Sequence, residues 1–374
     1  MDWTAPLPAI TRRRALRGLG TAAIALSFAP LAGCGEGDRL DFANWESYLG
    51  ETTLDDFKDA SGIDVSLSVI ASEEALFKQL ATGTAVPDLL IASNRLVERL
   101  VAAHLLAPLS HPKLSGLRNL DPRFADPPYD PELRYSVPFT WQAYGIGYRK
   151  SKVPVPPKGW ADLFDNSAYA GRIALPADSA KLFRIIARTL GKGPNAIEPE
   201  DMPLLTALMQ RQLTRIKAFH TDNGQDLLLN QQVDLVGEFN GDIAQVMLED
   251  PDLGFVMPIE GSELTCDGLC VPAHAANAGN AHRFIAYLLQ SQAGMRVLHT
   301  ILYPTPNLAA KALMPPDYQT SAVLFPPAEL IAKCAFARWD PRLDAAIKAS
   351  WDAIHPGSGP ASPGKAQDRL PSAS

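Results

Sequence analysis

The stretch RLDFANWESYLGETTLDDFKDASGIDV, residues 39–65, contains a strand, a helix and the start of a second strand, and it decides the fold prediction. RLDFAN has the composition of a buried strand. TLDDFKDAS places Leu54 and Phe57 three residues apart, as on one face of a helix, and Gly62 follows as a stop signal. IDVSLSVI then alternates apolar and polar residues, which is the period of a strand. The stretch therefore predicts a βαβ unit.

The same alternation continues further along the chain. SEEALFKQLATG begins with Ser72, a good helix N-cap, and ends at Gly83. PDLLIAS reads as another buried strand, and RLVERLVAAHLL as the next helix. A β-α-β-α-β order predicts a parallel, doubly wound sheet with right-handed crossovers.

The second half of the chain predicts a second sheet of this kind. Residues 114–135 read as irregular, and YSVPFTWQAYGIGYRKS resumes as strands. GRIALPADS and QVDLVGEFNG each lead from a strand into a helix, and PLLTALMQRQLTRIKAF has Leu204, Leu208 and Ile216 at helical spacing. The tail at 356–374 is rich in Pro, Ser and Gly and is predicted to be disordered.

The N-terminus has the features of an export signal. A basic segment with Arg12, Arg13 and Arg14 precedes an apolar run at residues 19–32, which is too short for a stable membrane span of about 20 residues. The run ends in LAGC, which resembles the lipobox of bacterial lipoproteins, and the basic segment resembles a twin-arginine signal. We expect residues 1–33 to be a signal peptide and Cys34 to carry a lipid that anchors the protein to a bacterial membrane. The alternative is an ordinary signal peptide in which Cys34 is coincidental.

Composition excludes several classes of function. The chain has 374 residues, enough for two domains, with a net charge of −7. Residues 1–33 contain four Arg and one Asp, so their removal leaves a net charge of −10. An acidic surface disfavours nucleic acid and anionic lipid as partners. The patterns GxGxxG, GxxxxGK[ST], GxSxG and HExxH do not occur.

The cysteines and histidines have no metal-binding spacing, so neither a metal nor a cofactor is expected. Cys266 and Cys270 would lie about 13 Å apart along a strand, too far for a mutual disulfide. Either could pair with Cys334.

Polar and aromatic side chains collect at the predicted strand ends, where ligands bind in doubly wound sheets. Separated carboxylates can accept charge-assisted hydrogen bonds from an alkylammonium, and aromatic faces can cover its methylenes and add cation–π attraction. These residues are Trp45, Glu46, Tyr48, Ser93, Asp178, Phe239, Asp242, Asp267 and Tyr303.

Each of these residues also has a purely structural interpretation. Asp178 and Asp242 precede helical patterns and could serve only as N-caps. Trp45 and Tyr48 could belong to the core, and Asp267 beside Gly268 could mark a turn.

Over residues 40–355 the chain resembles the substrate-binding proteins of spermidine/putrescine ABC importers. The matching sequence motifs are NWESY, GIDV, YSVPF, GIGY, NLDP, GWADLFD, YAGRI, TDN, NGD and YPTPNLAAKAL. The resemblance implies a type II periplasmic binding protein of the α/β class, with two doubly wound lobes joined by a multi-strand hinge. Lobe 1 would comprise 38–138 and 258–303, and lobe 2 would comprise 139–257 and 304–355. The chain would cross between the lobes near Pro138, Pro258 and Tyr303.

The resemblance also assigns roles to individual residues. Trp45 and Tyr48 match positions that flank a polyamine chain, Ser93 and Asp178 match pocket residues, and Asp267 matches the aspartate that binds a terminal amine. Asp242 matches an aspartate of the putrescine-preferring branch, and Tyr303 matches a hinge tyrosine.

Four positions depart from the family pattern. Thr265 and Phe239 stand where tryptophan is usual, and Ala337 stands where a polar residue often reaches the ligand. Lys181 replaces an acidic ligand for an amine, and a cation there would oppose a second or third ammonium. Lys181 could instead point away from the site or be neutralised by Glu46.

These observations predict a periplasmic, monomeric, non-enzymatic receptor that delivers a small-molecule amine to the permease of an ABC importer. Asp242 and Asp267 would hold one ammonium and Asp178 the distal end, with Trp45, Tyr48 and Phe239 along the carbon chain. The alternatives are a zwitterionic or amino acid-like ligand if Lys181 faces the site, a carboxylate-pair hydrolase, an iron- or anion-binding protein of the same fold, and a polyamine sensor.

Overall fold

The computed structural model describes residues 37–164 and 167–355. The chain divides into two units, Met1–Gly35 and Glu36–Ser374, and the description below concerns the second. The predicted signal peptide, the predicted lipid attachment at Cys34 and the predicted disordered tail lie outside the described residues. Within the described ranges, no helix combines the length and apolar character that a bilayer span requires.

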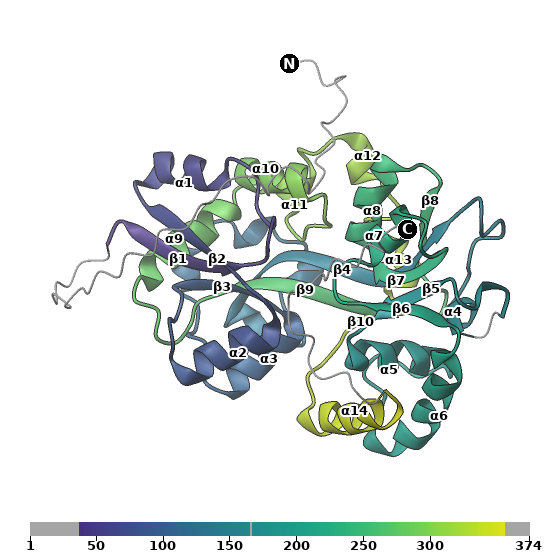
Figure 1. Cartoon of the computed structure of the whole chain (residues 1–374). Coiled ribbons are helices and arrows are strands. Elements are labelled where there is room, and N and C mark those ends of the chain that lie inside the picture. The colour runs from purple at the N-terminus through teal and green to yellow at the C-terminus, as the bar shows by residue number, and fades with distance from the viewer. Residues whose placement is uncertain (1–36, 165–166, 356–374) are drawn as a thin grey trace, which may run out of the picture. The chain divides into compact units, whose positions relative to one another are not determined.

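The strands join into one mixed sheet in the order β2-β1-β3-β9-β4-β7-β5-β6 (Figure 1). Two parallel groups, β2-β1-β3 and β7-β5-β6, flank the antiparallel pair of β9 and β4. β8 adds to β4, and β10 adds to β9. The strand bounds are β1 Arg39–Asn44, β2 Asp64–Val69, β3 Leu89–Ser93, β4 Ser136–Arg149, β5 Ile173–Pro176, β6 Ile216–His220, β7 Leu235–Phe239, β8 Leu253–Val256, β9 Glu263–Cys270 and β10 Ala335–Phe336.

Helices cover both sides of each parallel group. In Figure 1, α2 and α3 lie on one side of β1–β3 with α1 and α10 on the other, while α5, α6 and α14 lie opposite α7 and α8. The longer helices are α1 Thr53–Ser61, α2 Glu73–Thr82, α3 Asn94–Ala102, α5 Ser179–Arg188, α6 Met202–Leu213, α7 Gly224–Leu229, α8 Asn240–Glu249, α9 Ala278–Leu288, α10 Ser291–Ile301 and α14 Pro341–Ile354. The short ones are α4 Ala161–Phe164, α11 Leu308–Lys311, α12 Pro316–Gln319 and α13 Ala328–Ile331.

Two large hydrophobic clusters form the core. The first contains Phe42 and Phe284 and gathers residues from β1, β3, α9 and α10, and the second contains Trp160 and Phe183 and gathers residues from β5, α5, α6 and α14. We call the elements on the first cluster lobe 1 and those on the second lobe 2. The lobe boundaries expected from the sequence remain predictions.

The long strand β4 belongs to both lobes. Its first half pairs with β9 as far as Ala143, opposite Leu264, and from Tyr144, opposite Phe239, it pairs with β7. The change of partner lies beyond Pro138, near which the sequence predicted the crossing. A single continuous strand therefore carries the chain from one lobe to the other.

Local end signals predicted the first helices well. Ser72 Oγ accepts a hydrogen bond from the Ala75 amide at 3.1 Å, and α2 ends at Gly83 with φ of 68°. Gly62 ends α1 with φ of 76°, a left-handed conformation that glycine adopts without steric cost.

The predicted helix through Ile216 was wrong at its end. α6 stops at Leu213, and Ile216 begins β6, which pairs with β5. A β-branched residue and nearby Phe219 suit a strand, and pairing in the sheet overrides the helical spacing of Leu208 and Ile216. The possible disulfide is also absent, since Cys266, Cys270 and Cys334 are free thiols.

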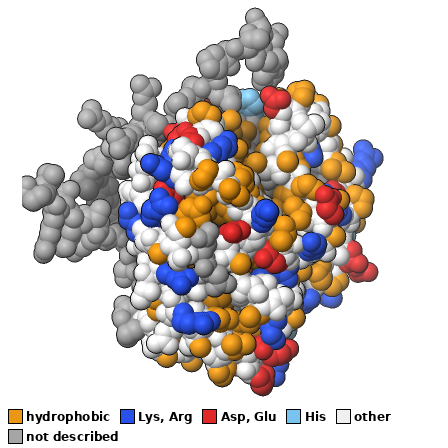
Figure 2. All heavy atoms as spheres, turned by 90° about the vertical axis from the view of Figure 1, so that its right-hand side faces the viewer, with side chains coloured by type: hydrophobic (Ala, Val, Ile, Leu, Met, Phe, Trp, Pro, Cys, Tyr) orange, Lys and Arg blue, Asp and Glu red, His pale blue; other side chains and the backbone are white. Residues whose placement is uncertain are grey.

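The described surface carries mixed charges. On the face shown in Figure 2, Lys and Arg side chains lie among Asp and Glu side chains. Leu204, Leu248 and Ile259 are exposed large hydrophobic residues, and single exposed residues of this kind are normal for soluble proteins.

The GIGY motif has a packing explanation in β4. A Cβ at Gly145 would lie 2.3 Å from the Phe255 ring and 2.7 Å from the Val256 carbonyl oxygen. At Gly147 it would lie 2.5 Å from Ile243 Cδ1. Glycine at both positions therefore lets β8 and α8 approach the strand that joins the lobes.

We predict that Gly145→Ala lowers the free energy of unfolding by about 1–3 kcal/mol, because the added methyl group overpacks β4 against β8. Gly193→Ala is the matched control, since its Cβ would meet no atom closer than 3.7 Å. Urea unfolding of both variants measures the effect. Equal stabilities would show that β8 shifts without cost and would contradict this account of the motif.

Candidate ligand-binding site

The candidate site begins where strands end and helices start. α3 follows β3 directly at Ser93, and α8 follows β7 directly at Phe239. Asp178 lies between β5 and the first residue of α5. Carboxyl ends of parallel strands are the usual ligand-binding edge of this architecture. The sequence predicted strand ends for Ser93, Asp178 and Phe239 correctly, whereas Asp267 lies within β9 and Tyr303 follows α10.

Tyr48, Thr140 and Asp267 form a buried chain of hydrogen bonds. The Tyr48 hydroxyl donates to Asp267 Oδ2 at 2.8 Å. The same hydroxyl lies 2.6 Å from Thr140 Oγ1. Since a phenol has one proton, Thr140 donates to Tyr48 when Tyr48 donates to Asp267. Residues from the β1 exit, β4 and β9 are thereby tied together at one point.

A second tyrosine–carboxylate pair lies beside the first. The Tyr303 hydroxyl donates a short hydrogen bond to Asp242 Oδ1. The rings of Tyr48 and Tyr303 meet edge to face with centroids 5.5 Å apart. Gly241 makes room for this arrangement, since a Cβ there would lie 2.4 Å from the Tyr303 ring. The structure therefore brings together four predicted residues, namely Tyr48, Asp242, Asp267 and Tyr303.

The Asp267 carboxylate is buried, and no cation among the described residues neutralises it. Its side chain is 8% exposed. Desolvation by burial raises its pKa to about 6, and the charge of Glu73 acts in the same direction. The hydrogen bond from Tyr48 and the charge of Lys181 oppose the rise in pKa. Within the described part of the chain, no Lys, Arg or His forms an ion pair with it. Such a carboxylate gains strongly from a cationic ligand.

Lys181 faces the site rather than the bulk solvent. Its side chain lies in the interior at 9% exposure, with Nζ 3.8 Å from the centroid of the Phe239 ring and 4.6 Å from that of Tyr144. These two rings are perpendicular, with centroids 5.1 Å apart. The alternatives of a solvated Lys181 or one neutralised by Glu46 are therefore wrong. We call Lys181, Phe239 and Tyr144 the lysine platform.

Asp178 is the N-cap of α5 and also lies among cations. Its Oδ1 accepts a hydrogen bond from the Lys181 amide at 3.1 Å. The side chain is exposed to solvent, yet desolvation by the surrounding protein tends to raise its pKa. The charges of Lys181, Arg95 and Arg184 outweigh that tendency and lower the pKa. The negative charge of Asp178 is therefore already compensated in part by these cations.

Asp242, by contrast, lies inside α8 and is not its N-cap, which is Phe239.

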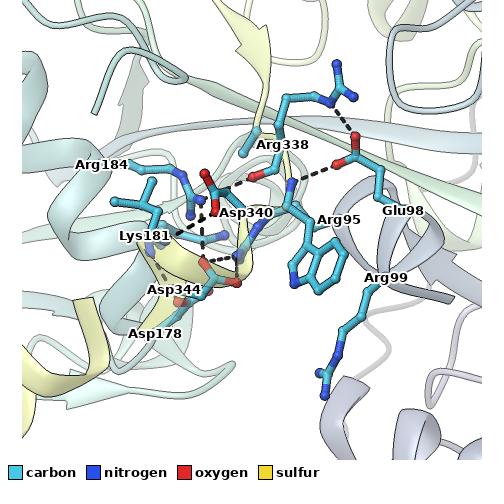
Figure 3. A network of polar contacts seen from close by, with 12 residues as sticks. Arg95, Glu98, Arg99, Asp178, Lys181, Arg184, Arg338, Asp340 and Asp344 are labelled. Atoms are coloured by element: carbon cyan, nitrogen blue, oxygen red, sulfur yellow. Dashed lines mark hydrogen bonds and ion pairs between the residues drawn. The ribbon is translucent and has the colours of Figure 1, made fainter. Parts of the chain in front are cut away.

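Two ion pairs bridge the lobes near Asp178 (Figure 3). Arg95 on α3 donates through Nη2 to both carboxylate oxygens of Asp344 on α14, at 2.6 and 2.7 Å. Arg338, just before α14, pairs with Glu98 on α3. Glu98 also accepts a hydrogen bond from the Trp339 amide at 2.6 Å. We call Arg95, Glu98, Arg338 and Asp344 the latch.

Three predicted residues have weaker connections to this cluster. Trp45 is half-buried and packs on the lobe 1 core. Ser93 caps α3 by accepting from the Leu96 amide at 3.3 Å. Glu46 is exposed and forms no hydrogen bond or ion pair among the residues that are described. Their roles in binding remain predictions.

Sequence reasoning missed Glu73 and Arg95. Burial and the charge of Asp178 raise the pKa of Glu73, while Ser93 and Arg95 lower it, so Glu73 lies near both. Acidic residues are common in the first turn of any helix, so nothing in the sequence distinguished Glu73. Arg95 directly follows the Ser93 strand end, which was an available signal.

The structure also shows the surroundings of Thr265 and Ala337, two of the departures from the family pattern. Thr265 lies on β9 two residues before Asp267, so both side chains face the same side of the strand, and it is half-exposed. Ala337 is buried, and its carbonyl oxygen accepts a hydrogen bond from Asn94 Nδ2 at 2.6 Å.

Among the described residues, no group of three or more His, Cys, Asp or Glu could hold a metal ion.

Comparison with known proteins identifies the family of the chain. Residues 52–326 match the family of bacterial extracellular solute-binding proteins. The spermidine/putrescine-binding periplasmic protein of Salmonella typhimurium is 31% identical over 86% of this chain and 91% of its own length. The putrescine-binding periplasmic protein of Escherichia coli is 27% identical over 91% of this chain and 98% of its own length.

Solved structures of substrate-binding proteins also match the fold of this chain. The spermidine/putrescine ABC transporter substrate-binding protein of Streptococcus pneumoniae matches with a TM-score of 0.77 and 25% identity, over 84% of this chain and 98% of its own. A putative spermidine/putrescine ABC transporter protein of Listeria monocytogenes matches with a TM-score of 0.79 and 25% identity, over 85% and 99%. The fold is that of a two-lobed periplasmic binding protein. The chain belongs to the bacterial extracellular solute-binding proteins, in the group that includes the spermidine/putrescine-binding periplasmic proteins.

Proposed function

We propose that this protein captures a polyamine of the putrescine and spermidine class outside the cytoplasm and delivers it to the permease of an ABC importer. One observation carries the proposal: Asp267 is a buried carboxylate, held by Tyr48, with a raised pKa and no ion-pair partner among the described residues. An alkylammonium supplies the missing positive charge. The polyamine-binding relatives support this assignment.

The neighbouring groups suit the rest of such a ligand. Asp242, paired with Tyr303, provides a second carboxylate beside Asp267. The Tyr48 and Tyr303 rings offer apolar surface to methylenes, and half-buried Trp45 at the β1 exit could extend it. Glu73 is a candidate for the other ammonium. We expect micromolar or tighter affinity, about −8 kcal/mol or better.

The remaining parts of the proposal concern location and partners. The export signal at 1–33 and the LAGC sequence support an extracytoplasmic protein held to the membrane by a lipid on Cys34. Binding would close the lobes around the ligand, and a permease would recognise the closed form. We propose that the protein acts as a monomer and binds without turnover.

A zwitterionic ligand is the second candidate. The cations Lys181, Arg95 and Arg184 all lower the pKa of Asp178, so positive charge gathers at that end of the site. A carboxylate on the ligand could bind there while an amine met Asp267. The polyamine assignment is preferred because relatives over most of the chain length bind polyamines by name.

We predict that Asp267→Asn weakens putrescine binding by about 1.5–3 kcal/mol, the range for a hydrogen bond to a charged group. The same variant should be more stable than the wild type without ligand. A carboxyl whose folded pKa is raised contributes stability below pH 4 that is lost as the pH rises through 6. At pH 8 the substitution should therefore stabilise the free protein by about 1–3 kcal/mol.

Isothermal titration and thermal unfolding of the Asp267→Asn variant measure the two effects. Asp59→Asn, at an exposed position on α1, is the control for a lost negative charge. Unchanged affinity would remove Asp267 from the site. Lower stability at pH 8 would mean that its charge supports the fold instead.

We predict that putrescine affinity falls by about tenfold per pH unit below pH 6, because the ligand requires ionised Asp267. Burial raises this pKa most, the charge of Glu73 raises it further, and the Tyr48 hydrogen bond and the charge of Lys181 oppose the rise. Titration at pH 6 in two buffers of different ionisation enthalpy should show proton release on binding. Constant affinity between pH 5 and 8, with no proton release, would contradict the proposal.

We predict that Asp344→Ala weakens putrescine binding about 3- to 10-fold through faster dissociation, because it removes the Arg95 ion pair between the lobes. Asp352→Ala, on the exposed part of the same helix, is the matched control. Stopped-flow displacement measures both rates. Equal dissociation rates for the variant and the wild type would show that the latch does not stabilise the closed form.

A further inference from the structure

In the lysine platform, the Lys181 ammonium group contacts aromatic rings in the same way as an amine ligand does in a binding protein. Lys181 Nζ lies over the Phe239 ring at 3.8 Å and near the face of Tyr144 at 4.6 Å. Tyr144 is fixed from behind by Trp160, stacked at 6.2 Å, and its hydroxyl donates to the Gly237 carbonyl oxygen at 2.5 Å. Two rings set at right angles by the fold thus surround one ammonium group.

The charge of Lys181 affects the pKa values of carboxylates in and near the site. It helps to lower the pKa of Asp178, and it opposes the rise in pKa that burial causes at Asp267 and at Glu238. It also lowers the pKa of buried His220. Yet among the described residues no carboxylate lies within ion-pair distance of Nζ, and Nζ forms no hydrogen bond. The ammonium is held by aromatic faces and by the surrounding negative field, as a free alkylammonium would be.

We propose that the Lys181 ammonium permanently occupies one ammonium subsite of this protein, so that the site takes a diamine and excludes a triamine. The inference rests on the proposed polyamine function and narrows its ligand class. A diamine places its ammonium groups near Asp267 and Asp242 and near Glu73, and leaves the platform to Lys181. The additional ammonium of a triamine would meet the Lys181 charge on the same rings and be repelled.

The position of Lys181 on α5 fixes the backbone of the lysine platform. Asp178 caps the helix at the Lys181 amide, and Leu182 and Phe183 anchor the same turn in the lobe 2 core. The backbone that carries the lysine is therefore fixed from two sides. Lys181 acts as a specificity-determining residue, and the fold does not need its charge to form α5.

The test measures dissociation constants for putrescine and spermidine by isothermal titration at one pH and salt concentration. The variants are Lys181→Ala, which empties the subsite, and Lys181→Arg, which keeps a cation there. Lys152→Met removes a positive charge at an exposed position outside the site and is the control.

We expect wild type, Lys181→Arg and Lys152→Met to bind putrescine more tightly than spermidine. In Lys181→Ala the ratio of the two dissociation constants should move at least tenfold toward spermidine. A smaller shift, or a wild type that prefers spermidine, overturns the inference. A wild type that binds no amine at all overturns the proposed function instead, so the two failures are distinguishable.

A structure of the putrescine-bound wild type gives an independent result should Lys181→Ala fail to fold. The inference requires Lys181 Nζ to remain over the Phe239 ring with putrescine bound. A putrescine ammonium in its place, with Lys181 displaced, would overturn it.

Discussion

The buried carboxylate of Asp267 is the constraint on which the rest of the site depends. Removing an ionised carboxylate from water is costly unless a cation or several hydrogen bonds compensate. Here the Thr140–Tyr48–Asp267 chain supplies one hydrogen bond to the carboxylate, and burial still raises its pKa to about 6. The free protein thus retains an unfavourable charge that a cationic ligand relieves. Such a cost is common at binding sites, where stability and function compete.

The strand pair β4 and β9 makes that arrangement possible. β9 carries Asp267 opposite Thr140 on β4, and β4 continues into lobe 2, where it pairs with β7 up to Phe239, three residues before Asp242. Glycines in GIGY allow close packing along this strand. Residues far apart in the sequence therefore meet because one strand belongs to both lobes. The lysine platform and the latch bring lobe 2 side chains to the same region.

The sequence predicted much of this fold for identifiable reasons. The caps at Ser72 and Gly62 and the strand–helix order depend on local chemistry, which a single sequence displays. Ile216 was assigned wrongly because its helical spacing could not reveal pairing with β5. The strand-end rule holds for Tyr48, which follows β1, and for Asp242, which follows β7 at the start of α8, but Asp267 lies within β9 and Tyr303 follows α10, so the rule was wrong for these two. Glu73 and the orientation of Lys181 were not predictable, since each depends on side chains from distant elements.

The most direct test of the central claim is a thermal-shift screen of the protein from Gly35 onward against putrescine, cadaverine, spermidine, agmatine, γ-aminobutyrate and aminoethylphosphonate. The account predicts stabilisation that grows with the concentration of the diamines putrescine and cadaverine, as ligand linkage requires, and a smaller effect of spermidine. A response to the two zwitterions alone would contradict it, because Lys181 and its neighbouring cations would then be binding a ligand anion.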